Sequence, residues 1–319
     1  MNKTVNQTEQ KLIVGLCTYK RLPSLMRLLE HIALSAKPLT QAPLVVVVDN
    51  DGNNPAVESA IMDFSKKSAM EVRYLIETKP GISAARNAIF AEADKQKARF
   101  VAMIDDDEWP SVNWLSELLA IQAQTSAVVV GGPVAPVFPE KAAKLQKYAR
   151  YWSVEKQLLN GQPFVFCTCN FLIDMAAIAQ TPRPLFDEAF GLSGGGDTVF
   201  FRKLFFAGHK MAWADNALVY EEVPDSRASF SWMRQRRFRV GNHAVRWESL
   251  DAGKLRSTLK TMGLMARLFI YPIFRREPES PFVGWLLEFD KVRGRIAGHF
   301  GDVFVEYARP ANICKKDEF

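Results

Sequence analysis

Three aspartates and a glutamate follow one another directly after an apolar run in the segment FVAMIDDDEWP, residues 100–110. The run has the composition of a buried strand. In an α/β sheet, ligands bind beyond the C-terminal ends of the strands, where Asp105, Asp106 and Asp107 would lie. Adjacent carboxylates raise each other's pKa unless a cation offsets their charge. Such oxygen ligands suit Mg²⁺ or Mn²⁺, which also bind phosphate oxygens. The segment therefore indicates a metal-assisted phosphate site, and the alternative is a solvated acidic turn.

Polar side chains follow two other strand-like runs in the first half of the chain. Thr18 and Arg21 follow the run at 11–17, and Asp49 follows the run at 44–48. A carboxylate only accepts hydrogen bonds, so Asp49 is suited to the donor edge of a nucleotide base. Together with the aspartates, these residues indicate a site for a nucleotide diphosphate.

Two more candidates lie at predicted helix starts. Arg86 follows Gly81 near a helix N-terminus, where backbone amides and a guanidinium favour phosphate, although an arginine there is more often a surface residue. Asp197 follows the glycines at 194–196 and precedes a predicted helix over 198–207. An aspartate in this position is suited to cap that helix.

The elements that position these residues alternate along the chain. The 319 residues are 48% hydrophobic, which is ordinary for a globular protein with a large core. Strand-like runs alternate with helical patterns up to residue 133, which predicts an α/β fold with a mainly parallel central sheet flanked by helices. Beyond it we expect a helix over 142–161 and a strand over 164–173. Neither GxGxxG after the first strand nor GxxxxGK[ST] occurs, which disfavours a dinucleotide-binding fold of the usual kind and a P-loop.

The basic charge is concentrated at the C-terminal end. The formal net charge is +6, and from Arg227 onward 18 Lys and Arg face 10 Asp and Glu. This region suggests an anionic partner. No N-terminal apolar segment predicts a signal peptide, and no run of about 18 apolar residues predicts a spanning helix. The cysteines show no zinc-like spacing and indicate buried thiols in a reducing cytoplasm: Cys17, Cys167, Cys169 and Cys314.

The ordered motifs TYKR, VVVVDND, GISAARN, MIDDDEWP, GGP and GGGDTVFFRKL resemble those of the inverting family 2 glycosyltransferases with the GT-A fold. The bacterial enzymes that build exopolysaccharide or lipid-linked oligosaccharide are the most similar group. The resemblance covers about residues 11–245. We expect a disordered tail, a GT-A catalytic domain with a nucleotide-sugar half and an acceptor half, and a basic helical C-terminal extension: residues 1–10, 11–225 (11–133 and 134–225) and 226–319.

The resemblance implies a role for each nucleotide-site candidate. Asp49 matches the carboxylate that binds the nucleotide base, and Thr18 and Arg21 match the loop around the nucleotide. Arg86 matches the arginine near the base and the diphosphate. The donor implied is a nucleotide-diphosphate sugar, with a UDP-sugar favoured, and the acceptor is a saccharide or a lipid-linked saccharide. No nucleic acid partner is expected.

The same resemblance implies the catalytic roles. Asp105 and Asp107 match the D-x-D pair, with Asp105 near the ribose and Asp107 on a Mg²⁺ or Mn²⁺ ion, and Asp106 fills the variable position on the nucleotide-sugar side. Asp197 matches the base that takes the acceptor proton, and residues 194–196 match the loop that presents it. Inverting transfer needs only one such carboxylate.

The sequence departs from the family pattern at three places. Gly196 stands where a glutamate usually precedes the base. Glu221 and Glu222 stand where many relatives have a histidine near the metal, so either glutamate could bind the metal or both could be solvated. Trp232 precedes the arginines instead of following them, so the QxxRW motif of processive relatives is absent and single-sugar addition is expected. The arginines of this segment either reach the diphosphate or face water.

The segment 255–273 is amphipathic. Its apolar residues fall on one side and its basic residues on another: Leu255, Leu259, Met262, Ala266 and Phe269, against Arg256, Lys260 and Arg267. This pattern fits an in-plane helix on an anionic leaflet or a helix packed on the catalytic domain. With the basic extension, it leads us to expect a peripheral enzyme on the cytoplasmic face of the membrane.

Two alternative functions are weighed against these features. A nucleotidyltransferase that makes sugar nucleotides needs a glycine-rich loop after the first strand, and TYKRLP contains no glycine. A nucleic-acid-binding protein could use the basic segment 227–246. That function leaves the aspartates and Asp197 unexplained, because an acidic strand end repels phosphate unless a metal intervenes.

Overall fold

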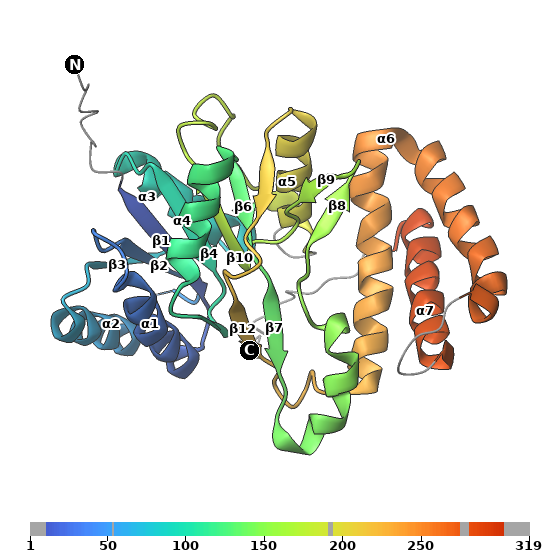
Figure 1. Ribbon diagram of the computed structural model, residues 1–319, viewed down its shortest axis with the longest axis horizontal. Coiled ribbons are helices and arrows are strands. Elements are labelled where there is room, and N and C mark those ends of the chain that lie inside the picture. The colour runs from blue at the N-terminus through green and yellow to red at the C-terminus, as the bar shows by residue number, and fades with distance from the viewer. Residues whose placement is uncertain (1–10, 53, 191–193, 275–280, 303–319) are drawn as a thin grey trace, which may run out of the picture.

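A computed structural model describes residues 11–52, 54–190, 194–274 and 281–302. The expected tail at 1–10, Arg275, Arg276 and Cys314 lie outside the described residues. The main sheet has seven strands in the order β11-β6-β10-β4-β1-β2-β3, and only β10 runs antiparallel to its neighbours (Figure 1). Its strands are β1 (Leu12–Thr18), β2 (Leu44–Asp49), β3 (Val72–Ile76), β4 (Phe100–Ile104), β6 (Val129–Gly131), β10 (Asn170–Asp174) and β11 (Met211–Trp213). The predicted mainly parallel α/β sheet is confirmed.

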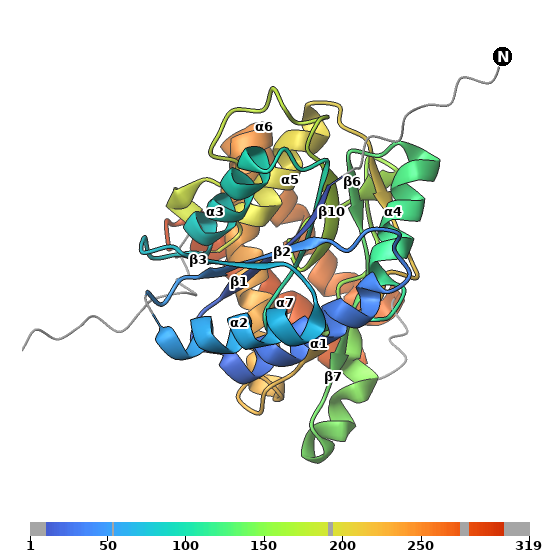
Figure 2. The same ribbon diagram turned by 90° about the vertical axis from the view of Figure 1, so that its left-hand side faces the viewer.

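Helices cover both faces of this sheet: α1 (Leu22–Ala36), α2 (Pro55–Ser68) and α4 (Trp114–Thr125) on one, and α3 (Ile82–Lys95) and α5 (Gly196–Phe206) on the other. Figure 2 shows α1 and α2 below the strands and α3 and α5 above them. All seven residues of β1 are buried, as expected for a strand covered on both faces. Gly15 lets α3 approach β1 closely, because a Cβ at this position would lie 2.4 Å from Cγ2 of Ile89 on α3.

Two smaller sheets extend the main one. The strands β5 (Glu108–Pro110), β12 (Val219–Glu222) and β7 (Val134–Val137) form a sheet in that order. In β12, Glu221 pairs with Glu108 of β5. This sheet joins the acidic turn to the second half of the fold.

The predicted helix over 142–161 is only partly correct. A 3-10 helix, η1 (Glu140–Tyr151), is followed by a hairpin of β8 (Gln157–Leu159) and β9 (Gln162–Phe164). Asn160 and Gly161 both have positive φ, 52° and 77°, as a two-residue hairpin turn requires. The predicted strand over 164–173 is only partly correct, because residues 170–173 lie in β10 and Phe164 ends β9, whereas residues 165–169 are not in a strand. A second short 3-10 helix, η2 (Glu188–Phe190), precedes α5.

The C-terminal region is helical. The long α6 (Phe230–Phe274) is interrupted at Gly253, where φ is 80° and ψ is 155°, and α7 (Pro281–His299) lies between its two halves (Figure 1). The first half of α6 contacts α7 at two glycines, Gly241 on α6 and Gly294 on α7. A Cβ on Gly241 would lie 1.9 Å from the Lys291 carbonyl oxygen, and one on Gly294 would lie 1.9 Å from the Phe238 carbonyl oxygen. The helices are therefore in backbone contact.

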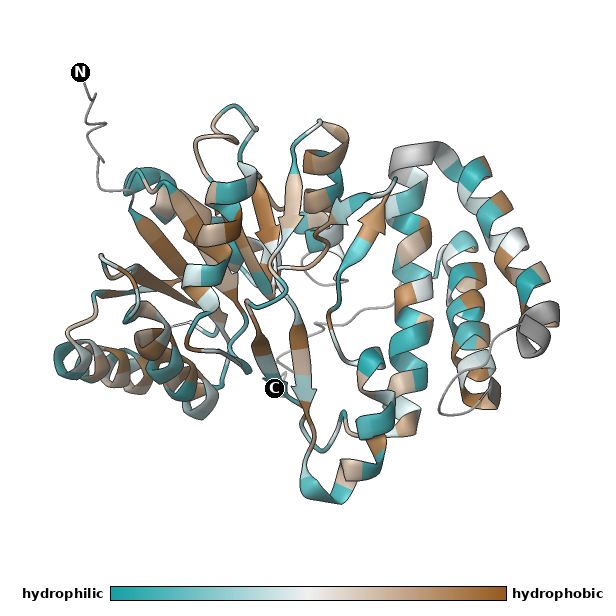
Figure 3. Ribbon diagram, in the orientation of Figure 1, coloured by the Kyte–Doolittle hydropathy of each residue, from teal (hydrophilic) through white to brown (hydrophobic). Residues whose placement is uncertain are grey.

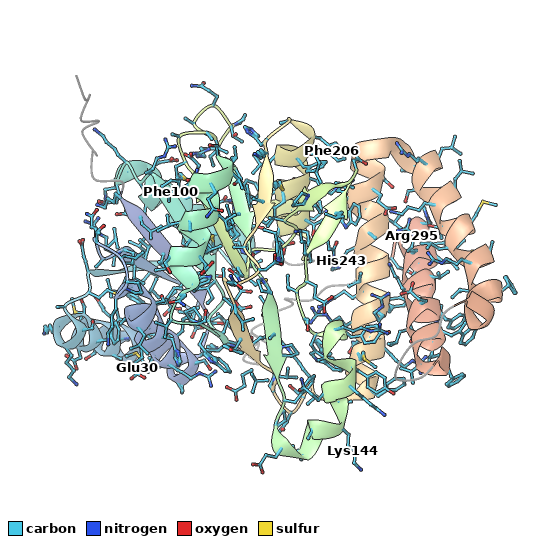
Figure 4. All side chains as sticks on the ribbon, viewed as in Figure 1. Glu30, Phe100, Lys144, Phe206, His243 and Arg295 are labelled. Carbon is cyan, nitrogen blue, oxygen red and sulfur yellow. The ribbon has the colours of Figure 1, made fainter. Side chains whose placement is uncertain are left out.

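The second half of α6 is held to α7 by a buried polar network. Arg295 of α7, labelled in Figure 4, is 1% exposed and donates to Glu248 at 2.6 Å and to the Thr261 hydroxyl at 2.8 Å. A buried ion pair with these extra bonds is fully satisfied, which fixes how the helices meet. Within the described residues, no helix combines the length and the apolar character needed to cross a membrane.

Candidate active site

A cavity of about 500 Å³ lies at the C-terminal ends of β1 and β4. Its lining comes from segments far apart in the sequence: 17–21, 81–86, 105–108, 166–169 and 194–197, together with Asn50, Val154, Glu221 and three arginines at 227, 236 and 239. The parallel strands bring the first and third of these segments together, because β1 and β4 are neighbours in the sheet. This edge is where an α/β sheet binds ligands.

The acidic turn after β4 is held by residues of the β1 loop. The Thr18 hydroxyl donates to Asp106 at 2.9 Å, and Arg21 donates to Asp106 at 2.8 Å and to Asp107 at 2.7 Å. The Glu108 carboxylate accepts the backbone N–H of Asp105 at 2.9 Å. The structure thus brings together five of the residues predicted from sequence and adds Glu108 to them.

Negative charge dominates this part of the cavity. Loss of hydration raises the pKa of Asp105 to about 6. This value already includes an opposing effect of Arg86 and smaller raising effects of Asp107, Asp106 and Asp197. Burial also raises the pKa of Glu108 well above its usual range, with Asp105 adding to the effect. Raised pKa values in a cluster of carboxyls show that their negative charge is not fully offset, so a bound cation would be favourable there.

Glu221 and Glu222 occupy different environments, because neighbouring strand residues point to opposite faces. Glu221 lines the cavity, and burial together with Asp107 raises its pKa to about 7. The guanidinium of Arg227 lies 3.6 Å from Asp107 and 3.7 Å from Glu221. Glu222 instead pairs with Arg27 at 2.7 Å and its side chain is 55% exposed.

Arg86 and Asp197 face the same cavity from the two helices on one side of the sheet. Arg86 is buried on α3, 3.9 Å from Asp105. Asp197 lies in the first turn of α5 and accepts the N–H of Thr198 at 2.8 Å. The N-cap position of α5 is Gly195, with φ 84°, so Asp197 lies inside the helix and is not its N-cap. His243 of α6 lies next to this loop (Figure 4), 3.8 Å from the position of a Cβ on Gly195.

Asp49 is the one predicted site residue outside the cavity lining. It is 1% exposed at the end of β2, and its carboxylate accepts from the Tyr74 hydroxyl at 2.7 Å and from the Asp51 N–H at 2.9 Å. Burial and the bond to Asp49 raise the pKa of Tyr74. The structure therefore places this carboxylate in a buried hydrogen-bonded pair beside the cavity.

Asn50 lines the cavity instead, and the sequence analysis missed it. Its amide donates to the carbonyl oxygens of Glu77 and Lys79 at 2.7 and 2.8 Å and accepts the N–H of Gly81 at 3.0 Å. These bonds fix the segment that leads into α3 and so position Arg86. The only sequence signal was its place directly after Asp49.

Thiols and arginines complete the lining. The buried Cys17 has its pKa raised to about 12 by loss of hydration, and the Sγ of Cys169 donates to the Sγ of Cys167 at 3.0 Å. Arg236 and Arg239, one helical turn apart on the first half of α6, also line the cavity. This α6 segment therefore turns arginines toward the cavity.

The carboxylates give the cavity the donor set of a hard divalent cation. Within the described residues, the acidic, histidine and cysteine side chains do not already form a group of three or more metal ligands. The guanidinium of Arg227 lies between Asp107 and Glu221. The oxygen atoms of these two carboxylates are therefore close enough to share one cation. The residues present therefore fit an Mg²⁺ or Mn²⁺ ion held through oxygen.

Comparison with known proteins gives the class. The family model of glycosyl transferase family 2 matches residues 13–181, more than half of the chain. The chain belongs to this family, and it is a glycosyltransferase with a GT-A fold, as the resemblance implied. Family membership decides against the nucleotidyltransferase and nucleic-acid-binding alternatives.

A particular relative and several structures add detail. The succinoglycan biosynthesis protein ExoM of Rhizobium meliloti (strain 1021) is 33% identical over 228 residues, 72% of each protein. The mannosyltransferase PcManGT from Pyrobaculum calidifontis, solved with GDP-Man and Mn²⁺, superimposes with a TM-score of 0.58 at 16% identity over 92% of this chain and 88% of its own. S. aureus TarS 1–349 with UDP gives 0.50 at 14% identity, covering 93% and 97%. The similarity to these two structures supports the assignment of the GT-A fold.

Proposed function

We propose that this chain is an inverting, metal-dependent glycosyltransferase that moves one sugar from a nucleotide-diphosphate sugar, preferably a UDP-sugar, to an acceptor hydroxyl. The observation that carries this proposal is that Asp197 and the acidic turn line one cavity, although 90 residues separate them in the sequence. A base for the acceptor and a site for the leaving diphosphate are both required for this reaction. We propose the division into a catalytic part, 11–225, and a basic extension, 226–319, with α6 contributing to the cavity.

The donor half of the cavity suits a nucleotide diphosphate. Arg86, Arg236 and Arg239 line it, and guanidinium groups bind phosphate oxygens in bidentate fashion. Thr18 and Arg21 hold the acidic turn and lie beside the nucleotide, and Asp105 and Asp106 face its ribose side. The base would lie toward Asp49 and Asn50, where Asn50 has the direct access to the cavity.

The metal would be held by Asp107, and we add Glu221 as its neighbour in the site. When bound, an Mg²⁺ or Mn²⁺ ion offsets the charge that develops on the leaving diphosphate. In PcManGT the donor is bound with Mn²⁺, which supports this choice of ion. Arg227, between the two carboxylates, adds a second positive charge on the same side of the cavity.

Asp197 supplies the proton step. Its carboxylate takes the proton of the acceptor hydroxyl while that oxygen bonds to the anomeric carbon. The bond from this carbon to the diphosphate oxygen breaks on the opposite side. One displacement of this kind inverts the anomeric centre, and it needs no second carboxylate beside the sugar. The first turn of α5 presents this carboxylate to the cavity.

The biological role proposed is synthesis of exopolysaccharide or of a lipid-linked oligosaccharide, on the cytoplasmic face of the membrane. The similarity to ExoM supports the first part. The acceptor would be a saccharide or a lipid-linked saccharide. A nucleic acid partner is not proposed, because Arg227, Arg236 and Arg239 line the sugar-nucleotide cavity.

A donor screen tests this function. Purified full-length chain is incubated with UDP-, GDP- and dTDP-sugars, with Mn²⁺ and with a chelator, and release of the nucleoside diphosphate is followed. We expect slow, metal-dependent hydrolysis of one donor class. Absence of hydrolysis and of binding for every sugar nucleotide would overturn the proposal. Proton NMR of the product formed with an accepted saccharide then shows whether the anomeric centre is inverted.

A further inference from the structure

The second half of α6, from Gly253 to Phe274, exposes its apolar side. Leu255 is 74% exposed and Phe269 is 84% exposed, and Leu259, Met262 and Met265 are exposed between them. The helical repeat places these residues on one side of the helix. We define this set as the apolar stripe. Figure 3 shows apolar residues interspersed with hydrophilic ones along this half of α6.

The buried side of the same helix begins with polar residues. Ser257 and Thr261 are 2% and 4% exposed and belong to the network with Arg295 and Glu248 of the α6–α7 pair. Leu264 and Leu268 continue this side at the helical repeat and are half-buried. The helix therefore packs on α7 through this side, and the apolar stripe lies on the opposite, exposed side. Figure 1 shows this half of α6 on the far side of α7 from the sheets.

Basic residues border the stripe. Lys254, Arg256 and Arg267 are exposed beside it, and Lys260 pairs with Glu248 at 2.5 Å. No aspartate or glutamate occurs from Lys254 to Phe274. An apolar strip with basic borders is complementary to an anionic lipid surface, where apolar side chains enter the acyl boundary and cations meet the phosphates.

Aromatic residues of α7 extend the stripe at its C-terminal end. The indole N–H of Trp285 donates to the Leu268 carbonyl oxygen at 3.1 Å, which joins the start of α7 to the end of α6. Phe282, 67% exposed, stacks on the Trp285 ring. Aromatic side chains with one polar contact are favoured at membrane interfaces.

We propose that this surface, the apolar stripe with Phe282 and the basic border, lies in the plane of an anionic phospholipid bilayer and docks the enzyme on it. This inference deepens the proposed function and rests on its membrane location. A second copy of the chain is the less favoured occupant. Its basic border would lie against the border of the first, and like charges repel.

The test uses the full-length chain and vesicles of phosphatidylglycerol mixed with phosphatidylcholine, or of phosphatidylcholine alone, in flotation assays. We expect binding to the anionic vesicles and little to the neutral ones. Binding should weaken between about 0.1 M and about 1 M salt, because the Debye length falls from about 10 Å to about 3 Å.

Two variants separate the apolar and basic contributions. The triple variant Leu255→Gln, Leu259→Gln, Met262→Gln and the double variant Arg256→Glu, Arg267→Glu should each weaken vesicle binding by about tenfold or more. Met62→Gln, which changes an exposed methionine on α2, is the matched control and should bind as the wild type. Unchanged circular dichroism and unchanged donor hydrolysis without vesicles would show that the variants are folded.

Three results would overturn the docking surface. The first is wild-type binding that is equally strong to neutral and anionic vesicles, and the second is vesicle binding by the triple variant that equals that of the wild type. The third is a wild type that is a dimer in ultracentrifugation together with a triple variant that is a monomer. The proposed function fails in a different measurement, the hydrolysis of sugar nucleotides in vesicle-free solution.

Discussion

Arg21 donates a hydrogen bond to Asp107 at 2.7 Å, so the carboxylate proposed for the metal ion is already paired with a cation of the chain. The same guanidinium binds Asp106 at 2.8 Å, and Arg227 approaches Asp107 from the loop after β12. Two arginines thus share the charge of the acidic turn. A divalent ion held there would add its charge to theirs beside the diphosphate of the proposed donor.

Asp197→Asn should abolish most transfer. Removal of a general base costs about 10²–10⁴-fold in rate, and the asparagine keeps the shape of the first turn of α5. Donor binding, measured by calorimetry with the nucleotide diphosphate and Mn²⁺, should persist. Asp215→Asn, at an exposed turn, is the control. Transfer near the wild-type rate in Asp197→Asn would remove Asp197 from the reaction.

Glu221→Gln and Glu222→Gln form a matched pair for the metal site. Glu221 lines the cavity beside Asp107, whereas Glu222 pairs with Arg27. We expect Glu221→Gln to raise the Mn²⁺ concentration needed for donor hydrolysis by about tenfold or more, by analogy with losses around metal sites. Glu222→Gln should leave it unchanged. Equal metal dependence in the two variants would contradict the role of Glu221. A chelator should abolish donor hydrolysis in both variants.

The metal-free protein should lose stability as the pH rises from about 4.5 to about 7. The pKa of Glu221 is about 7 in the fold against an ordinary value of 4.5, so the folded state binds more protons than the unfolded state in this window. The free energy of unfolding then falls with increasing pH, by about 2–3 kcal/mol from this group. Denaturant melts with chelator at pH 5 and pH 8 measure it. Glu221→Gln should remove the share of this group and leave the shares of Asp105 and Glu108, whose pKa values are also raised. A wild type with no pH dependence would contradict this prediction.

Gly241→Ala should destabilise the chain. The new methyl group would lie 1.9 Å from the Lys291 carbonyl oxygen, so the helices must separate, at a cost of about 1–3 kcal/mol or more. Gly263→Ala is the matched helix position, with nothing within 4 Å, and should stabilise by about 1 kcal/mol. Thermal melts of both variants compare the two effects. A Gly241→Ala variant as stable as the wild type would show that the helices have room to shift.

The sheet could be predicted from the sequence because its strands are apolar runs followed by polar residues, and the aspartates after β4 marked its ligand-binding end. The antiparallel direction of β10 could not, because periodicity carries no strand direction. The hairpin at Asn160 and Gly161 had a recognisable turn signal that the helical composition around it obscured.

Within the site, the residue types were predictable and their partners were not. Arg21 and Asp107 lie 86 positions apart, and only the neighbouring strands bring them together. Strand alternation separates Glu221 from Glu222 but does not say which one faces the cavity. For Asp49, the deciding neighbour is Tyr74 on β3, which no local pattern links to it.

The backbone contact of Gly241 with α7 also bears on how this chain can change over evolutionary time. Arg236 and Arg239 line the cavity and lie five and two residues before that glycine on the same helix. The helix α7 therefore supports this wall of the cavity from the outer side. A lineage that shortened its C-terminus before Pro281 would lose this support along with the helix. We therefore expect a recombined chain to keep this close packing only when α6 and α7 come from one parent.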